Sequence, residues 1–92
     1  MTDILLRILT PSPDAAESAV GDETVLLHLV NGTYYGLDAV GTQIWRMLKD
    51  GAALPDICRR LVEDFGVDLP TIESDVRAFL SDLLAQDIVI DG

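Results

Sequence analysis

The pair Asn31-Gly32 constrains the fold of this chain more than any other feature of its sequence. Asn and Gly both tolerate the positive φ angles of a tight type I′ turn, and the pair is typical of two-residue β-hairpins. An apolar, β-branched run over 24–30 precedes the pair, and a second short run over 33–37 follows it. Asp38 then suits the cap of a helix that begins near Ala39. The sequence therefore predicts a hairpin that leads directly into a helix.

The predicted strand 33–37 has one neighbour in the sequence, and we find no strong candidate for a second. Alternate side chains of a strand share a face, so Tyr35 falls with Thr33 and Leu37, and Tyr34 falls on the other face. Leu37 must lead into the core because the helix begins beside it. We therefore expect Tyr35 to point inward and Tyr34 outward. The unpaired edge could dock an extended peptide, or it could pair two copies of the chain as a homodimer.

The whole pattern predicts an α+β fold of the winged helix-turn-helix type, with a two- or three-stranded antiparallel sheet followed by three helices. Segment 4–9 is apolar and could be a short strand or an appended arm, and Pro11 and Pro13 then break the chain. We divide the chain into an N-terminal arm, 1–14, and a single domain, 15–92. Within that domain, hydrophobic periodicity and capping residues predict a weak strand over Ala15–Val20, helices over Ala39–Lys49, Leu54–Phe65 and 69–86, and a short wing-like strand over 88–90.

The charge of the chain restricts its partners. Sixteen acidic and six basic residues give a formal net charge of −10. The predicted last helix carries Arg77 as its only basic residue, whereas DNA-binding domains normally carry a basic face. We therefore expect neither nucleic acid nor a membrane as partner, and a basic peptide is favoured. No signal peptide is apparent, and the single cysteine, Cys58, cannot form an internal disulfide, so we expect a cytoplasmic protein.

The sequence contains no pattern typical of a catalytic centre. His28 is the only histidine and is expected to be an ordinary strand residue, while Cys58 falls on the apolar stripe of a predicted helix. One histidine, one thiol and scattered carboxylates do not have the spacing of a metal site or of a nucleophile–base pair. No glycine-rich phosphate loop is present. We therefore expect a protein that is not an enzyme and that needs neither cofactor nor metal.

The hairpin and the helix after it resemble the PqqD-like family. The resemblance lies in residues 22–29, DETVLLHL, in residues 31–45, NGTYYGLDAVGTQIW, and in residues 72–80, IESDVRAFL. Members of that family are precursor-peptide recognition elements of ribosomally made, modified peptides. They bind a leader peptide as an added strand beside a helix and present it to processing enzymes. The resemblance implies a stand-alone element, with lasso-peptide pathways most similar, whose partners are a precursor leader and a leader peptidase or other modifying enzyme.

By this resemblance the leader would add to strand 33–37 in a groove against helix 69–86. The expected peptide-binding residues are Thr33, Tyr34, Tyr35, Gly36, Leu37, Ile72, Asp75, Val76, Phe79, Leu80 and Leu83. Strand addition alone supplies roughly 2–7 kcal/mol from four or five hydrogen bonds, and association costs on the order of 4–15 kcal/mol. Apolar anchors must therefore supply the surplus. A winged-helix-like interaction or regulatory module with another protein partner is the alternative.

Overall fold

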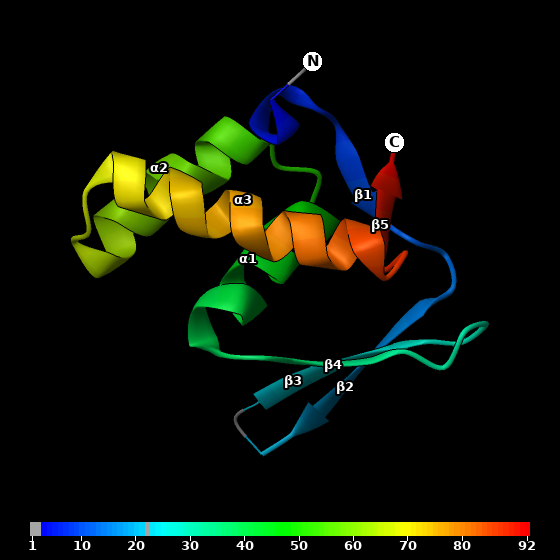
Figure 1. Cartoon of the computed structure of the whole chain (residues 1–92). Coiled ribbons are helices and arrows are strands. Elements are labelled where there is room, and N and C mark those ends of the chain that lie inside the picture. The colour runs from blue at the N-terminus through cyan, green and yellow to red at the C-terminus, as the bar shows by residue number, and fades with distance from the viewer. Residues whose placement is uncertain (1–2, 22) are drawn as a thin grey trace.

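The structure, a computed structural model, describes residues 3–21 and 23–92. Within them, the chain forms two small sheets and a group of three helices (Figure 1). In chain order the elements are η1 (Ile4–Leu6), β1 (Leu9–Pro11), β2 (Ala15–Val20), β3 (Glu23–His28), β4 (Tyr34–Leu37), α1 (Ala39–Lys49), α2 (Leu54–Phe65), α3 (Leu69–Ala85) and β5 (Val89–Asp91). The α+β architecture and the order of sheet and helices are as expected.

The larger sheet has the order β2-β3-β4, and both of its pairs are antiparallel. All three helices lie on one side of it (Figure 1). Leu26 pairs with Tyr35 and Leu27 with Tyr34, which sets the two faces of the hairpin. Tyr35 packs against the core while Tyr34 is 70% exposed, so the predicted directions of the two tyrosines are confirmed.

The predicted two-residue turn at Asn31-Gly32 is wrong. Strand β3 ends at His28 and β4 begins at Tyr34, so residues 29–33 form a five-residue connection, and Thr33 lies outside the strand. Gly32 has φ +75°, but Asn31 does not have positive φ. The Asn31 side chain instead accepts a hydrogen bond from the Thr33 N–H at 2.8 Å. This local side-chain bond offers the backbone an alternative to the tight turn, which the residue pair alone does not reveal.

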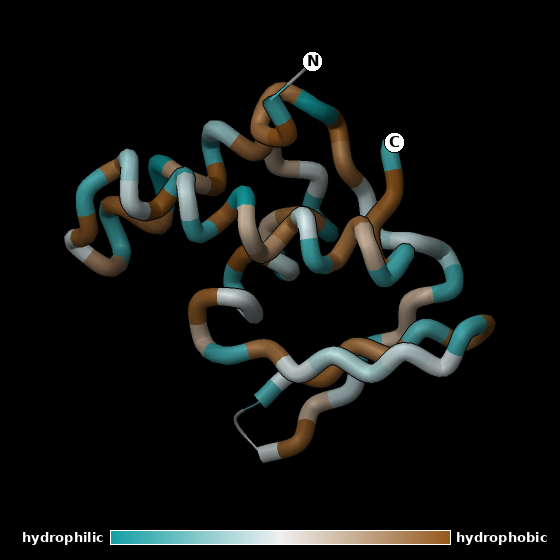
Figure 2. The backbone as a smooth tube through the Cα atoms, viewed as in Figure 1, coloured by the Kyte–Doolittle hydropathy of each residue, from teal (hydrophilic) through white to brown (hydrophobic). Residues whose placement is uncertain are grey.

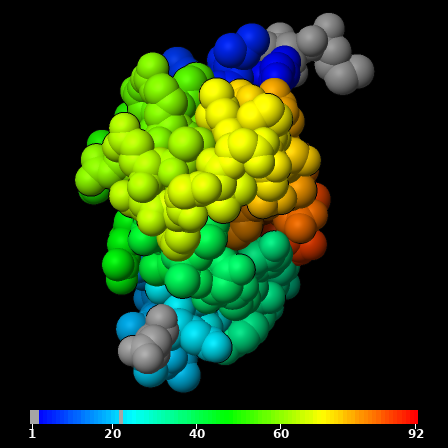
Figure 3. Space-filling view, turned by 90° about the vertical axis from the view of Figure 1, so that its left-hand side faces the viewer, coloured from blue at the N-terminus to red at the C-terminus, as the bar shows by residue number. Residues whose placement is uncertain are grey.

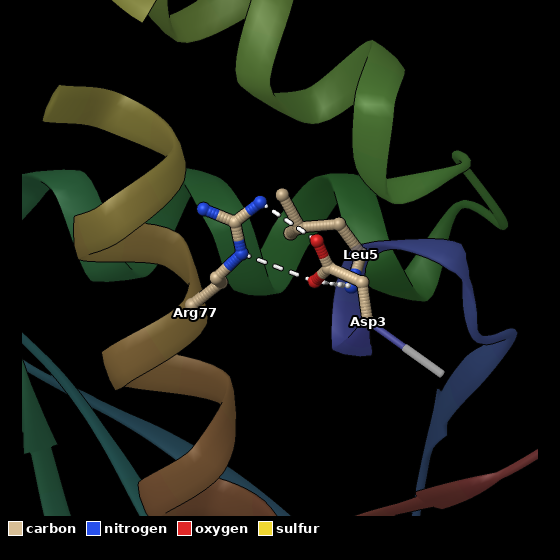
Figure 4. Close-up of polar contacts among 3 residues, drawn as sticks. All are labelled: Asp3, Leu5 and Arg77. Atoms are coloured by element: carbon tan, nitrogen blue, oxygen red, sulfur yellow. Dashed lines mark hydrogen bonds and ion pairs between the residues drawn. The ribbon is translucent and has the colours of Figure 1, made fainter. Parts of the chain in front are cut away.

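The smaller sheet joins the two ends of the chain. Strand β1 pairs antiparallel with β5, and Pro11, expected to break the chain, is paired with Val89 within this ladder. The Arg7 guanidinium makes a bidentate pair with Asp91, at 3.0 and 2.6 Å. Arg77 on α3 makes a second bidentate pair with Asp3, at 3.0 and 2.8 Å (Figure 4). Segment 4–9 thus contains the short 3₁₀ helix η1 and the first residue of β1. The ion pairs of Asp3 and Arg7, on either side of η1, link this segment to α3 and to β5.

The core is formed by the three helices together with side chains from η1 and from both sheets. Apolar residues recur at successive turns of each helix (Figure 2). Asp38 caps α1 by accepting a 2.7 Å hydrogen bond from the Gly41 N–H, and the left-handed Gly66 ends α2. Trp45 is fully buried, and its Nε1 donates to Glu17 on β2 at 3.2 Å, which ties α1 to the sheet. Among the described residues, no helix has the length and apolar character needed to cross a membrane.

Candidate functional site

Strand β4 is one edge of the larger sheet and β2 is the other, and within the described residues the outer side of β4 pairs with no other strand. The His28 N–H donates to the Thr33 carbonyl at 2.9 Å, so these two residues form a hydrogen-bonded pair, and every second pair of the β3–β4 ladder is of the same kind. Tyr35, two residues later, therefore directs its N–H and C=O toward Leu26 on β3. The backbone groups of Tyr34 and Gly36 point the opposite way, outward from the sheet. The free edge thus offers two N–H and two C=O groups to an added strand.

Helix α3 runs antiparallel to β4 and packs beside it, as three contacts show. At one end the Asn31 Nδ2 donates to the Gln86 carbonyl at 3.4 Å. In the middle the Tyr35 hydroxyl donates to Asp82 at 3.4 Å, and the Tyr35 and Phe79 rings meet edge to face, with centroids 6.2 Å apart. Partial burial and the nearby Asp82 carboxylate raise the pKa of Tyr35. The side chains of β4 and α3 therefore form one surface along the free edge.

A small cavity lies where β4 passes into α1, and we call it the Phe79 pocket. It has a volume of about 220 Å³. Figure 3 shows α3, in yellow to orange, above the end of β4 and the beginning of α1, in teal to green. The pocket is lined by Asp38, Val40, Gly41, Ile44, Asp75 and Phe79. A Cβ atom at Gly41 would lie 3.2 Å from Phe79 Cε1, so a glycine here lets the ring approach the α1 backbone closely.

The structure divides the expected binding residues into accessible and buried ones. Tyr34, Gly36 and Asp75 are exposed, and Thr33, Tyr35 and Phe79 are partly exposed. The other five side chains belong to the core and have little surface to offer a peptide: Leu37, Ile72, Val76, Leu80 and Leu83. The sequence reading assigned no binding role to Asp38, Val40, Gly41 and Ile44, which line the pocket. A glycine inside a predicted helix was the one signal for them, because such a glycine often marks a close approach.

A larger cavity, of about 520 Å³, lies away from β4 between β1 and the connection from α1 to α2. Its walls include the exposed side chains of Leu6 and Ile8 together with Leu48 and Leu54. Volume alone would make it the first candidate for a site. It is lined neither by β4 nor by α3, so it does not adjoin the free strand edge.

His28 and Cys58 both have structural surroundings. His28 is buried, and its Nδ1 accepts hydrogen bonds from the N–H groups of Val30 and Asn31, both at 3.2 Å, so it holds the connection between β3 and β4. Cys58 is buried in the core, and this burial raises the pKa of its thiol. Over residues 3–21 and 23–92 no three His, Cys, Asp or Glu side chains come together as metal ligands.

The family model described as coenzyme PQQ synthesis protein D (PqqD) matches residues 23–89. The chain belongs to the PqqD family. Comparison with curated protein sequences finds no significant match. Among solved structures, TbiB1 in complex with the TbiA(beta) leader peptide is 40% identical to the PqqD-family chain, with a TM-score of 0.82, and the match covers 87% of this chain and 93% of TbiB1.

A second solved structure similar to the PqqD-family chain is lasso peptide synthetase B1 complexed with the leader peptide. It has a TM-score of 0.84 at 22% identity, and the match covers 90% of this chain and 98% of that one. At this identity the likeness shows a shared fold. The fold of the PqqD-family chain is therefore one that two leader-peptide complexes also contain.

Proposed function

We propose that this protein binds the leader segment of a precursor peptide as an additional strand on β4. The observation that carries the proposal is the free edge of β4 beside the accessible face of α3. The 40% identical TbiB1, whose structure contains a leader peptide, supports it over nearly the whole chain. A winged-helix-like module with another protein partner remains the second reading, and nothing in the described residues favours it.

The free edge of β4 and the Phe79 pocket would make separate contributions to the free energy of leader binding. The four outward groups of Tyr34 and Gly36 supply roughly 2–6 kcal/mol if each hydrogen bond contributes about 0.5–1.5 kcal/mol. Association costs on the order of 4–15 kcal/mol, and a micromolar complex needs about −8 kcal/mol in total. Side-chain anchors must therefore make up the difference. The Phe79 pocket adjoins the Gly36 end of the edge and is the site we propose for one of them.

We propose further that the protein works without catalysis and hands the bound leader to a peptidase or another modifying enzyme of the same pathway. Of the two nucleophilic or basic side chains noted above, Cys58 is shielded in the core and His28 accepts two backbone hydrogen bonds. Neither lines the Phe79 pocket. The chemistry on the precursor is therefore assigned to the partner enzyme.

The proposal is tested at Gly36, where proline and alanine separate the backbone donor from the side chain. Gly36→Pro removes an outward N–H and places its ring where an added strand would lie, without removing a hydrogen bond to β3. Gly36→Ala keeps the N–H, and no atom lies within 4 Å of its Cβ. Proline at Tyr35 would be a poor test because it breaks the bond to β3 and disturbs the hairpin itself.

The measurement is a fluorescence-anisotropy titration with the labelled TbiA(beta) leader peptide, the peptide in the structure of the 40% identical TbiB1, and circular dichroism verifies that both variants are folded. We expect Gly36→Pro to weaken binding at least about tenfold, because the variant loses one hydrogen bond to the added strand and its ring clashes with that strand. Gly36→Ala should bind within about twofold of the wild type. Equal affinities of a folded Gly36→Pro variant and the wild type would refute strand addition at this edge.

A further inference from the structure

We propose that the Phe79 pocket receives a lysine or arginine side chain of the bound leader. This inference rests on the leader recognition proposed above, and it adds the class of residue that the leader must present beside its added strand. The Phe79 pocket, rather than the backbone groups of β4, would then select between leaders that bind in the same extended conformation.

The walls of the pocket combine two kinds of surface. Val40 and the half-buried Phe79 ring provide apolar contact, with the buried Ile44 beneath them, whereas Asp38 and Asp75 bring carboxylates from two different helical segments. Long basic side chains bury their methylene stems against apolar surface and keep the charged group at a polar rim. A cation held near an aromatic ring gains a further favourable interaction. A short or purely apolar side chain would use only part of this lining.

The two carboxylates have no cationic partner within the described part of the chain. One oxygen of Asp38 accepts the Gly41 N–H at 2.7 Å, and Asp75 enters none of the ion pairs found in residues 3–21 and 23–92. Arg77, two residues from Asp75 on α3, pairs with Asp3 instead. In a chain with net charge −10, an incoming cation relieves repulsion that an apolar residue would leave in place.

The position of the pocket suits a side chain from an added strand. Gly36 offers the last outward N–H and C=O of β4, and the chain then passes through Leu37 to Asp38 at the pocket rim. The volume of about 220 Å³ equals roughly seven water molecules at about 30 Å³ each, which is room for one long side chain. A strand paired with Gly36 would therefore bring one inward-facing residue to the pocket.

The experiment compares Asp→Asn variants with leader variants. The probe is the fluorescein-labelled TbiA(beta) leader peptide, in its natural form and with each Lys or Arg replaced singly by Gln. Asp75→Asn and Asp38→Asn each remove one charge from the pocket, and asparagine still caps α1 at position 38. Asp64→Asn on α2 is the matched control, because Asp64 is exposed and outside the pocket.

Each pocket variant should weaken binding about two- to fivefold at about 50 mM salt, as removal of a partly exposed ion pair does. The difference should shrink at about 300 mM salt because the charges are then screened. Asp64→Asn should change the affinity by much less. One leader substitution should produce the same loss of affinity with the wild-type protein. The Asp75→Asn protein should bind that substituted leader only slightly more weakly than the wild-type protein does.

Three results would overturn the inference. Tight binding that depends on Gly36 but is unaffected by Asp38→Asn, Asp75→Asn and every Lys or Arg replacement would refute the basic subsite and leave leader recognition standing. A leader that does not bind the wild-type protein would overturn the proposed function and this inference together. A binding leader without any Lys or Arg would also refute the basic subsite.

Discussion

Phe79 and Leu80 are consecutive residues of α3 that face different surroundings, and replacing each by alanine separates binding from stability. Leu80 is 0% exposed and belongs to the core, so Leu80→Ala should cost about 2–5 kcal/mol. Phe79 is partly exposed and contacts Tyr35 edge to face. Losing that aromatic pair costs about 0.5–1.5 kcal/mol, and losing part of the burial adds to it, so we expect about 1–3 kcal/mol for Phe79→Ala.

The effect on leader binding should follow the opposite order. Phe79→Ala removes a wall of the pocket, and we expect affinity to fall about tenfold, which corresponds to about 1.4 kcal/mol. Leu80→Ala removes no accessible surface, so the folded fraction should bind within about twofold of the wild type. Urea denaturation gives the free energy of unfolding of both variants, and anisotropy titration well below the melting temperature gives their affinities.

The comparison of the two variants has a clear refuting result. A loss of affinity in Phe79→Ala that disappears after correction for the folded fraction, as expected for Leu80→Ala, would mean that Phe79 affects binding only through stability. Unchanged binding by a folded Phe79→Ala protein would remove the pocket from the site altogether. Either outcome would refute the assignment of Phe79 to the peptide-binding surface.

Three further predictions concern the rest of the molecule. Arg77 and the Leu5 N–H hold the pKa of Asp3 below its usual value of 3.8. The ionised Asp3 therefore stabilises the fold above pH 3.8, and this contribution is lost as the pH falls through the lower pKa of the folded state. Arg77→Gln should raise the pKa of Asp3 in an NMR titration. The buried Thr42 Oγ1 has no hydrogen-bond partner in the described structure, so Thr42→Val should leave the melting temperature unchanged or raise it. Burial and a raised pKa should keep Cys58 unreactive toward a thiol reagent at pH 8 in the native protein and reactive in urea, and fast native labelling would contradict its placement.

The sequence predicts the features of this fold that depend on neighbouring residues. Asp38 as helix cap and the inward direction of Tyr35 both follow from short-range rules and are confirmed. The helix bounds agree closely for the same reason, since apolar periodicity and capping residues mark them. Local patterns thus give the hairpin, the helices and the identity of the free strand.

Features that depend on distant residues could not be predicted in the same way. The β1–β5 sheet joins segments about eighty residues apart, and both strands are too short for their sequences to predict the pairing. The turn after β3 is decided by the side chains of His28 and Asn31, which bond to the backbone around them. The Phe79 pocket needs Asp38 and Asp75 to meet across two helices, and only tertiary packing brings them together.

The joining of the two chain ends has a practical consequence for experiments on this protein. The Gly92 N–H donates to the Ile8 carbonyl at 2.8 Å, and both ends of the described chain lie on the far side of the helices from the larger sheet (Figure 1). A label, a surface tether or a fused enzyme attached at either end would therefore point away from β4. Immobilised or fused forms of this domain should capture peptides as freely as the protein in solution.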